Sequence, residues 1–141
     1  NNPLLNRYSI LYANFLALGC MHLLDLEAYR EVEPLARQCL EIREFLDEPR
    51  WSYLNAKAML GRALAGQSKF AEAEPILRTG FLGLYMLRDK IPPAARNRLF
   101  EAGQALAALY EATKRPDQAK AIRALIPKEL APPPRTRSPG R

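Results

Sequence analysis

The side chains best suited to metal binding or nucleophilic chemistry are two cysteines and one histidine. Cys20 and His22 lie two residues apart, and Cys39 follows later in the chain. Residues two apart on a helix point to different sides, so Cys20 and His22 would not share a metal ion. Neither thiol has a plausible base that would activate it as a nucleophile. We therefore expect no metal, no cofactor, no catalytic cysteine, a structural His22 and reduced thiols.

Four glutamates recur in pairs and could support acid–base chemistry. Glu31 and Glu33 have the same spacing and the same following proline as Glu72 and Glu74. Paired carboxylates can act as general acid and base. These pairs, however, lie in the first turns of expected helices, where the helix dipole stabilises negative charge. We expect them to be structural.

The glutamates belong to a longer internal repeat. The stretch KFAEAEPILR, which begins at Lys69, resembles the stretch AYREVEPLAR, which begins at Ala28. Without a gap, residues 12–46 match residues 53–87 at nine of 35 positions, where about two matches are expected from average composition. A fainter third copy, LYEATKRPDQAKAI, aligns if five further residues are allowed, and these fit the loop DKIPPAA. Such a repeat predicts stacked copies of one structural unit.

The unit is helical. Apolar and small residues such as Phe70, Ala73, Leu77 and Gly80 recur at steps of three and four, and no strand-like alternation occurs. We expect an all-α domain over residues 1–127, with copies at about 4–46, 50–87 and 93–126. The expected helices span about 4–24, 28–46, 50–65, 69–87, 93–113 and 116–126, with prolines placed at or before several of them.

Small residues mark where the helices of a copy should cross. Cys20, Gly61 and Ala107 occupy one position of the three copies. Two helices approach closely only where the facing side chains are small, so we expect Gly61 to pack against Ala73. Ser68 stands where the N-cap of the fourth helix is expected.

These positions resemble the tetratricopeptide repeat. Gly61, Leu64, Phe70 and Ala73 match the core positions of that motif, and the period resembles the long subtype found in kinesin light chains and many bacterial proteins. The resemblance implies a right-handed superhelix of antiparallel helix pairs, with about three repeats. Pro116 and Arg123 depart from the motif in the third copy, which suits a terminal capping repeat.

A second resemblance covers residues 51–126. The run LNAKAMLGRALAGQSKFAEAEPILRTGFLGL, followed by DKIPPAARNRLFEAGQALAALYEATKRPDQA, is similar to the C-terminal repeat region of a class of bacterial serine/threonine protein kinases. No Gly-rich loop, His-Arg-Asp or Asp-Phe-Gly motif is present, so this chain is not itself expected to be an enzyme.

The resemblance also implies a binding surface. The first helices of tetratricopeptide arrays line a concave face, on which asparagine binds the backbone of an extended peptide. Asn14 and Asn55 occupy equal register there, and Met59, Arg62 and Gln104 would share the groove. Arg62 could receive a carboxylate. The alternative is that the asparagines are solvated or cap the backbone.

Charge and hydropathy bear on other partners. Of the net charge of +6, +3 lies in residues 128–141, a Pro- and Arg-rich tail that we expect to be disordered. The body is only mildly basic, which is a weak argument for a nucleic-acid partner, and we expect none. The uncharged stretch 8–24 is short for a membrane span, and we expect a helix buried between neighbours.

The resulting expectation is a cytoplasmic, non-catalytic module that binds a protein or extended peptide on its concave face. It would form the C-terminal region of a bacterial serine/threonine kinase, or a stand-alone scaffold. A small-molecule or enzymatic site would need a formed pocket with convergent polar groups. A nucleic-acid binder would show a steep dependence of binding on salt.

Overall fold

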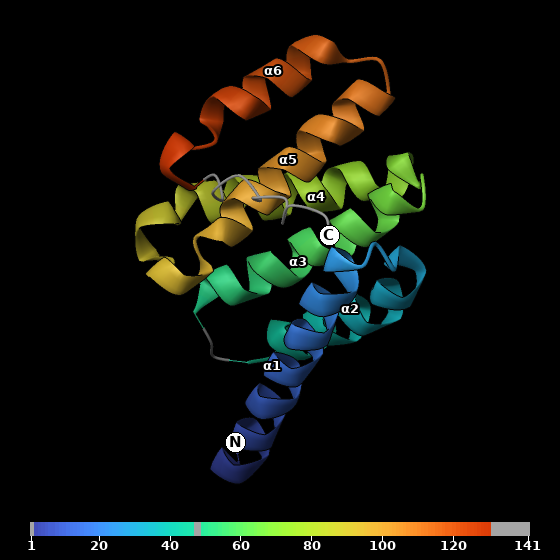
Figure 1. Ribbon diagram of the computed structural model, residues 1–141. Helices are drawn as coiled ribbons and strands as arrows, with labels where there is room; N and C mark the ends of the chain where they lie inside the picture. Colours follow the sequence, from blue (N-terminus) through green and yellow to red (C-terminus); the bar gives the residue numbers. More distant parts are fainter. Residues whose placement is uncertain (1, 47–48, 131–141) are drawn as a thin grey trace, which may run out of the picture.

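The computed structural model describes residues 2–46 and 49–130. In these residues the structure is helical and contains no strand. Its six α-helices pack in chain order, each against the next (Figure 1). They are α1 (Pro3–Asp25), α2 (Tyr29–Glu44), α3 (Arg50–Gly66), α4 (Phe70–Met86), α5 (Asn97–Ala112) and α6 (Pro116–Leu125).

Most expected helices agree closely with the observed ones at both ends, and the fifth does not. It was expected to start at Pro93, but Pro93–Ala95 form a short 3-10 helix, η2, and α5 begins at Asn97. A further 3-10 helix, η1 (Arg88–Lys90), precedes η2. The Pro92-Pro93 pair ends one turn and starts another, because proline disfavours helical geometry in the residue before it.

The beginning of the expected disordered tail is ordered. Residues Lys128–Leu130 form the 3-10 helix η3, which packs on α5 through the partly buried Leu130. The ordered domain therefore extends beyond residue 127. The rest of the expected tail, residues 131–141, lies outside the described residues.

Each helix pair is joined by the same tight turn. Glu27, Ser68 and Lys114 have positive φ angles of 56°, 61° and 61°, and they occupy equal positions in the three copies. The next residue in each turn donates its N–H to a carbonyl in the last turn of the preceding helix, as in Lys69 to Leu64 at 2.9 Å. This is the hydrogen bond of a Schellman motif, which ends a helix with a left-handed residue.

The expectation that Ser68 caps α4 is therefore wrong. The residue at the N-cap is Lys69, and no side chain caps that helix. Ser68 instead takes the left-handed conformation that closes α3, because a short turn between antiparallel helices needs one such residue.

The crossing of α3 and α4 depends on two glycines. A Cβ atom on Gly61 would lie 2.6 Å from Leu77 Cβ, and one on Gly80 would lie 2.8 Å from Ala58 N. The expected partner of Gly61, Ala73, is fully buried but lies one turn earlier than Leu77. Gly61 thus packs most closely against Leu77 rather than Ala73.

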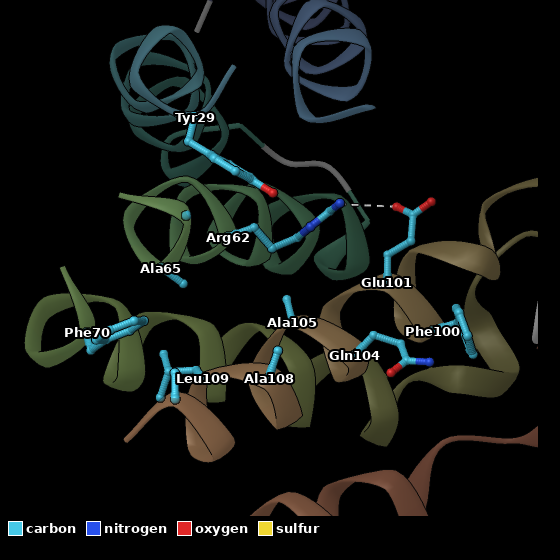
Figure 2. A pocket seen from close by; sticks show the side chains of 12 residues that line it. Tyr29, Arg62, Ala65, Phe70, Phe100, Glu101, Gln104, Ala105, Ala108 and Leu109 are labelled. Atoms are coloured by element: carbon cyan, nitrogen blue, oxygen red, sulfur yellow. Dashed lines mark hydrogen bonds and ion pairs between the residues drawn. The ribbon is translucent and has the colours of Figure 1, made fainter. Parts of the chain in front are cut away.

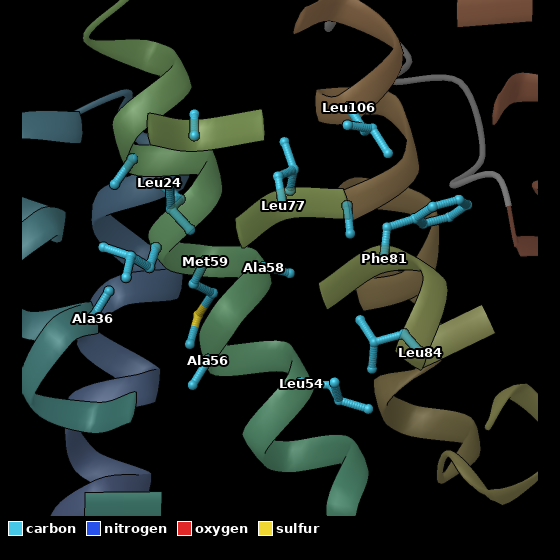
Figure 3. Close-up of a cluster of buried hydrophobic side chains, with 14 of the residues drawn as sticks. Leu24, Ala36, Leu54, Ala56, Ala58, Met59, Leu77, Phe81, Leu84 and Leu106 are labelled. Carbon is cyan, nitrogen blue, oxygen red and sulfur yellow. The ribbon is translucent and has the colours of Figure 1, made fainter. Parts of the chain in front are cut away.

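The core runs along the whole stack. Figure 3 shows Leu54 and Ala58 of α3 on the side of Leu77, Phe81 and Leu84 of α4, with Leu106 of α5 beyond them. Met59 lies on the other side of α3, toward Ala36 of α2. Helix α3 contributes the most buried residues of any helix in the described chain. It is enclosed because α2 and α4 pack against it from either side and α1 and α5 also reach it.

Helix α1 is covered on one side only. Ala13, Leu16, Ala17, Cys20 and Leu24 are buried. The opposite side is exposed, and the N-terminal half of the helix extends away from the others (Figure 1). The expectation of a helix enclosed between neighbours is therefore wrong for α1. Among the described helices, none has both the length and the apolar character that crossing a membrane requires.

Candidate functional site

A pocket of about 530 Å³ lies between the C-terminal half of α3 and the exposed side of α5. Its walls are mainly apolar and include Phe70 at the start of α4, Phe100, Ala105 and Leu109 (Figure 2). Tyr29, the first residue of α2, closes one side. Three helix pairs thus contribute to one surface.

The position of Tyr29 depends on a glycine. A Cβ atom on Gly66, the last residue of α3, would overlap the Tyr29 ring. The absence of a side chain there lets the ring lie directly against the end of α3. The aromatic wall of the pocket therefore rests on a backbone contact between the first and second copies.

The polar end of the pocket is an ion pair. Arg62 Nη1 donates to Glu101 Oε2 at 3.2 Å, and Arg98 donates to the same oxygen at 3.0 Å. The Nδ2 of Asn97 donates to the other carboxylate oxygen at 3.4 Å. Two guanidinium groups thus share one carboxylate, and Asp25 also interacts electrostatically with Arg62.

Burial lowers the pKa of Arg62, and the Glu101 carboxylate offsets this only in part. The cause is the loss of water around a guanidinium that is packed between α3 and α5. A cation that has lost hydration and is incompletely neutralised gains from a further acceptor. The pocket therefore pairs an apolar wall with a site suited to a carboxylate or carbonyl oxygen.

Two of the five residues expected in the groove lie together at this pocket. Arg62 and Gln104 both line it, on α3 and α5. Asn14 is on exposed α1, where its side-chain oxygen accepts a hydrogen bond from Arg43 at 3.1 Å. Asn14 therefore lies in the contact between α1 and α2 and does not line the pocket.

The other two expected groove residues are not at an open surface. Asn55 is only 9% exposed and Met59 only 1% exposed, and Met59 belongs to the core. The expectation of equal exposure for Asn14 and Asn55 is wrong. Helix α1 has no described helix on its outer side, whereas the equivalent side of α3 is covered by the first helix pair.

The sequence reasoning missed Tyr29, Phe70, Phe100 and Glu101 as pocket residues. A signal existed for two of them, since Tyr29 and Phe70 occupy equal positions of the first two copies. The resemblance to the repeat motif instead predicts that Phe70 is a core residue. Phe100 and Glu101 occupy the positions of Leu54 and Asn55 in the third copy but differ from them in residue type. Only the packing of α5 across α3 brings them to the pocket beside Arg62.

The repeated glutamates hold the copies together. Glu33 accepts hydrogen bonds from Lys69 and Gln67 of the next copy, both at 2.9 Å. Glu74 accepts from Arg115 of the copy after, at 2.8 and 2.6 Å. The side chain of Glu72 accepts from Arg37 at 2.6 Å. These partners support the expected structural role of the glutamates. The cause differs from the expected one, because the carboxylates form ion pairs between copies in addition to any stabilisation by the helix dipole.

The cysteines are buried and are not joined by a disulfide. Burial, with a smaller contribution from Cys39, raises the pKa of Cys20 to about 12. The Sγ of Cys39 donates to the Ala13 carbonyl oxygen at 3.5 Å. Both thiols thus occupy the α1–α2 contact, and His22 is exposed on α1.

The chain was compared with protein-family models, with curated proteins and with solved structures, and no match was found.

Proposed function

We propose that the chain is a tetratricopeptide-type protein-interaction module that binds an extended peptide segment across α3 and α5. The observation that carries this proposal is the pocket itself, in which apolar walls adjoin a guanidinium pair with one carboxylate. Helical repeats bind partners on the exposed helices that line one face of the stack.

Support for the repeat comes from the turns and from the ion pairs. The left-handed residues Glu27, Ser68 and Lys114 recur at equivalent positions of the aligned copies. The pairs Glu33–Lys69 and Glu74–Arg115 are also equivalent in that alignment. Equivalent backbone turns and equivalent contacts between copies support a regular stack of repeats, and the resemblance to the tetratricopeptide repeat implies that the stack is a right-handed superhelix.

The proposed ligand has two features. A large apolar side chain, aromatic or leucine, fills the walls formed by Phe70, Phe100 and Leu109. A carboxylate or backbone carbonyl next to it accepts from Arg62, and Gln104 can both donate to and accept from a peptide backbone. An acidic peptide with one apolar anchor meets both requirements.

The proposed setting is the cytoplasmic C-terminal region of a bacterial serine/threonine protein kinase, and a stand-alone scaffold is the alternative. The sequence similarity over residues 51–126 is its support. The upstream coding sequence tests it directly. A kinase domain with Gly-rich loop, His-Arg-Asp and Asp-Phe-Gly motifs ahead of Asn1 is expected, and a different upstream domain would contradict it.

A small-molecule site is a second candidate. The pocket volume of about 530 Å³ lies within the range of drug-sized ligand sites. Nevertheless, its walls come from three helix pairs and continue along the surface of α5, which suits an extended chain better than a compact ligand.

The test uses two alanines that are both exposed on helices. Ala108 lines the pocket and Ala121 lies on α6 away from it. A peptide library is screened against the whole chain, and the enriched peptides are measured by calorimetric titration. Ala108→Trp fills the groove and should weaken binding at least about tenfold, roughly 1.4 kcal/mol. Ala121→Trp should bind normally.

Equal binding by both variants would place the peptide elsewhere on the protein. Failure to enrich any peptide from an acidic, apolar library would contradict the interaction function itself. Enrichment of a small molecule that competes at Ala108, without peptide binding, would favour the second candidate.

A further inference from the structure

A row of large apolar side chains runs along the uncovered side of α1. Leu4, Tyr8, Leu11, Phe15 and Leu18, here called the α1 stripe, are separated by alternating steps of four and three. Each is between 52% and 72% exposed. Leu5 and Tyr12 flank the stripe and are also exposed. Figure 1 shows this helix extending beyond the rest of the stack.

The stripe is larger than a monomer normally leaves exposed. Its five side chains present on the order of 600 Å² of apolar surface, at or above the largest patch of a typical soluble monomer. The same helix already uses its other side for the core, through Ala13, Leu16 and Cys20. The stripe is therefore a second apolar face.

The stripe differs from the faces that join copies inside the protein. In the second copy, Leu11 corresponds to Ser52 and Phe15 corresponds to Ala56, both of which are buried. The third copy has Ala102 at the position of Phe15, also buried. Small residues at these positions let the preceding helix pair approach closely. Leucine and phenylalanine there would hold such a pair away.

The spacing fits a different kind of contact. Alternating steps of four and three are those of the a and d positions of a coiled coil, in which each large side chain inserts into a hole on the facing helix. Between Asn2 and Asp25 the only charged residue is Arg7. A partner helix therefore needs the same spacing and needs no complementary charge.

The stripe is also self-complementary. Leu4 and Leu18 each lie seven residues from Leu11, and Tyr8 and Phe15 lie three and four residues from it, so the stripe is approximately symmetric about Leu11. An antiparallel copy would therefore place Leu4 against Leu18 and Tyr8 close to Phe15. In both the antiparallel and the parallel arrangement, Leu11 of one copy lies against Leu11 of the other. Pairing two copies would bury about 1,200 Å² in total, the lower end of stable interfaces.

We propose that two copies of this chain pair through the α1 stripe, giving a two-fold dimer whose interface is a helix pair centred on Leu11. A two-fold contact uses the same patch on both subunits. The stripe lies on α1 and the peptide pocket between α3 and α5, so the dimer does not depend on the proposed peptide binding.

The first experiment measures the mass of the whole chain in solution. Sedimentation equilibrium from about 1 to about 100 µM covers the range in which an interface of this size self-associates. The unmodified chain should approach twice its mass of 15.9 kDa. Leu11→Glu/Phe15→Glu should remain monomeric, with an unchanged helical circular dichroism spectrum because both positions are exposed.

Phe45→Glu is the matched control, since Phe45 is an exposed aromatic residue at the end of α2. It should dimerise like the unmodified chain. A monomer at every concentration would overturn the proposal, and so would a dimer that survives Leu11→Glu/Phe15→Glu.

A second experiment tests the position of the dimer axis. Leu11→Cys should form a disulfide-linked dimer under mild oxidation, because either helix orientation places the two residues together. Phe45→Cys should not. A crosslink only at position 45 would show that the copies associate through another surface and would overturn the α1 pairing.

Discussion

Glu74 accepts hydrogen bonds from both terminal nitrogens of Arg115, at 2.8 and 2.6 Å, and so joins α4 to the turn that precedes α6. A parallel two-point contact of this kind is the strongest form of arginine–carboxylate pair. Arg78 also donates to Glu74, at 2.6 Å. Glu33 and Lys69 make the corresponding contact one copy earlier, at 2.9 Å. Equivalent carboxylates, Glu33 and Glu74, therefore link the first copy to the second and the second to the third.

Removing Arg115 should loosen the third copy. Arg115→Ala leaves the half-buried Glu74 carboxylate with Arg78 alone, and the thermal midpoint should fall by a few degrees. Arg115→Lys should recover part of the loss, because lysine keeps the charge but not the two-point geometry. Arg30→Ala, at an exposed arginine of α2, is the control and should change little. An unchanged midpoint for Arg115→Ala would show that the pair adds nothing to stability.

The same pairs predict a stability that falls in acid. Hydrogen bonds from Lys69 lower the pKa of Glu33, and those from Arg115 lower the pKa of Glu74, both from 4.5. A carboxyl whose folded pKa is below its unfolded pKa stabilises the fold above about pH 4.5, and this stability is lost as the pH falls through the folded pKa. The urea midpoint should therefore drop as the pH falls below about 4.5 and passes through the lowered folded pKa values of these two carboxyls.

Replacing the two paired glutamates by glutamine tests this acid effect, and replacing a glutamate elsewhere on the surface is the control. Glu33→Gln/Glu74→Gln should lower stability at neutral pH and flatten its dependence on pH. Glu41→Gln, at an exposed glutamate of α2, should leave the curve unchanged. If the double variant kept the full dependence of stability on pH, the loss of stability in acid would be due to other carboxyl groups.

Replacing a glycine by alanine should lower stability where the helices are closely packed and raise it where the only effect is on helix propensity. A Cβ on Gly61 would lie 2.6 Å from Leu77 Cβ and 2.8 Å from its Cα, and a backbone atom cannot rotate away. Gly61→Ala should cost roughly 1–3 kcal/mol of unfolding free energy. Gly19→Ala is the matched control, because nothing lies within 4 Å of its Cβ position. It should stabilise α1 by roughly 0.5–1 kcal/mol, and chemical denaturation measures both.

The left-handed turn residue predicts a stabilising change. Ser68 has φ 61°, a conformation that costs most residues about 1 kcal/mol and glycine almost nothing. Ser68→Gly should therefore raise the unfolding free energy by roughly 0.5–1 kcal/mol. Ala71→Gly, at an exposed position in α4, should do the opposite by about 1 kcal/mol. A destabilised Ser68→Gly would mean that the serine side chain stabilises the turn.

The buried thiols should be slow to react. A pKa of about 12 for Cys20 leaves very little thiolate at pH 8, and the thiol is also inaccessible. A thiol reagent should label Leu26→Cys, at an exposed position, at once, and should label Cys20 and Cys39 only after unfolding. Rapid labelling of Cys20 in the folded protein would show that the α1–α2 contact opens readily.

The number of helices and their register could be read from the sequence, because both follow from local periodicity and from the internal repeat. Glu27 and Ser68 fall in equal positions of the sequence copies and also in equal left-handed turns. The backbone conformation at each helix end could not be read in the same way. The backbone conformation of Ser68 depends on the antiparallel helix that follows it, whereas an N-cap preference depends on the serine alone.

The identity of the exposed face was decided only by the tertiary structure. Asn14 and Asn55 are equivalent in sequence, yet one is exposed and the other is buried, because the first helix pair covers α3 and no described helix covers the outer side of α1. Met59 is enclosed for the same reason, and Glu101 reaches Arg62 because α5 packs across α3. Periodicity places residues on a common face of a helix, but burial of that face depends on helices distant in the chain.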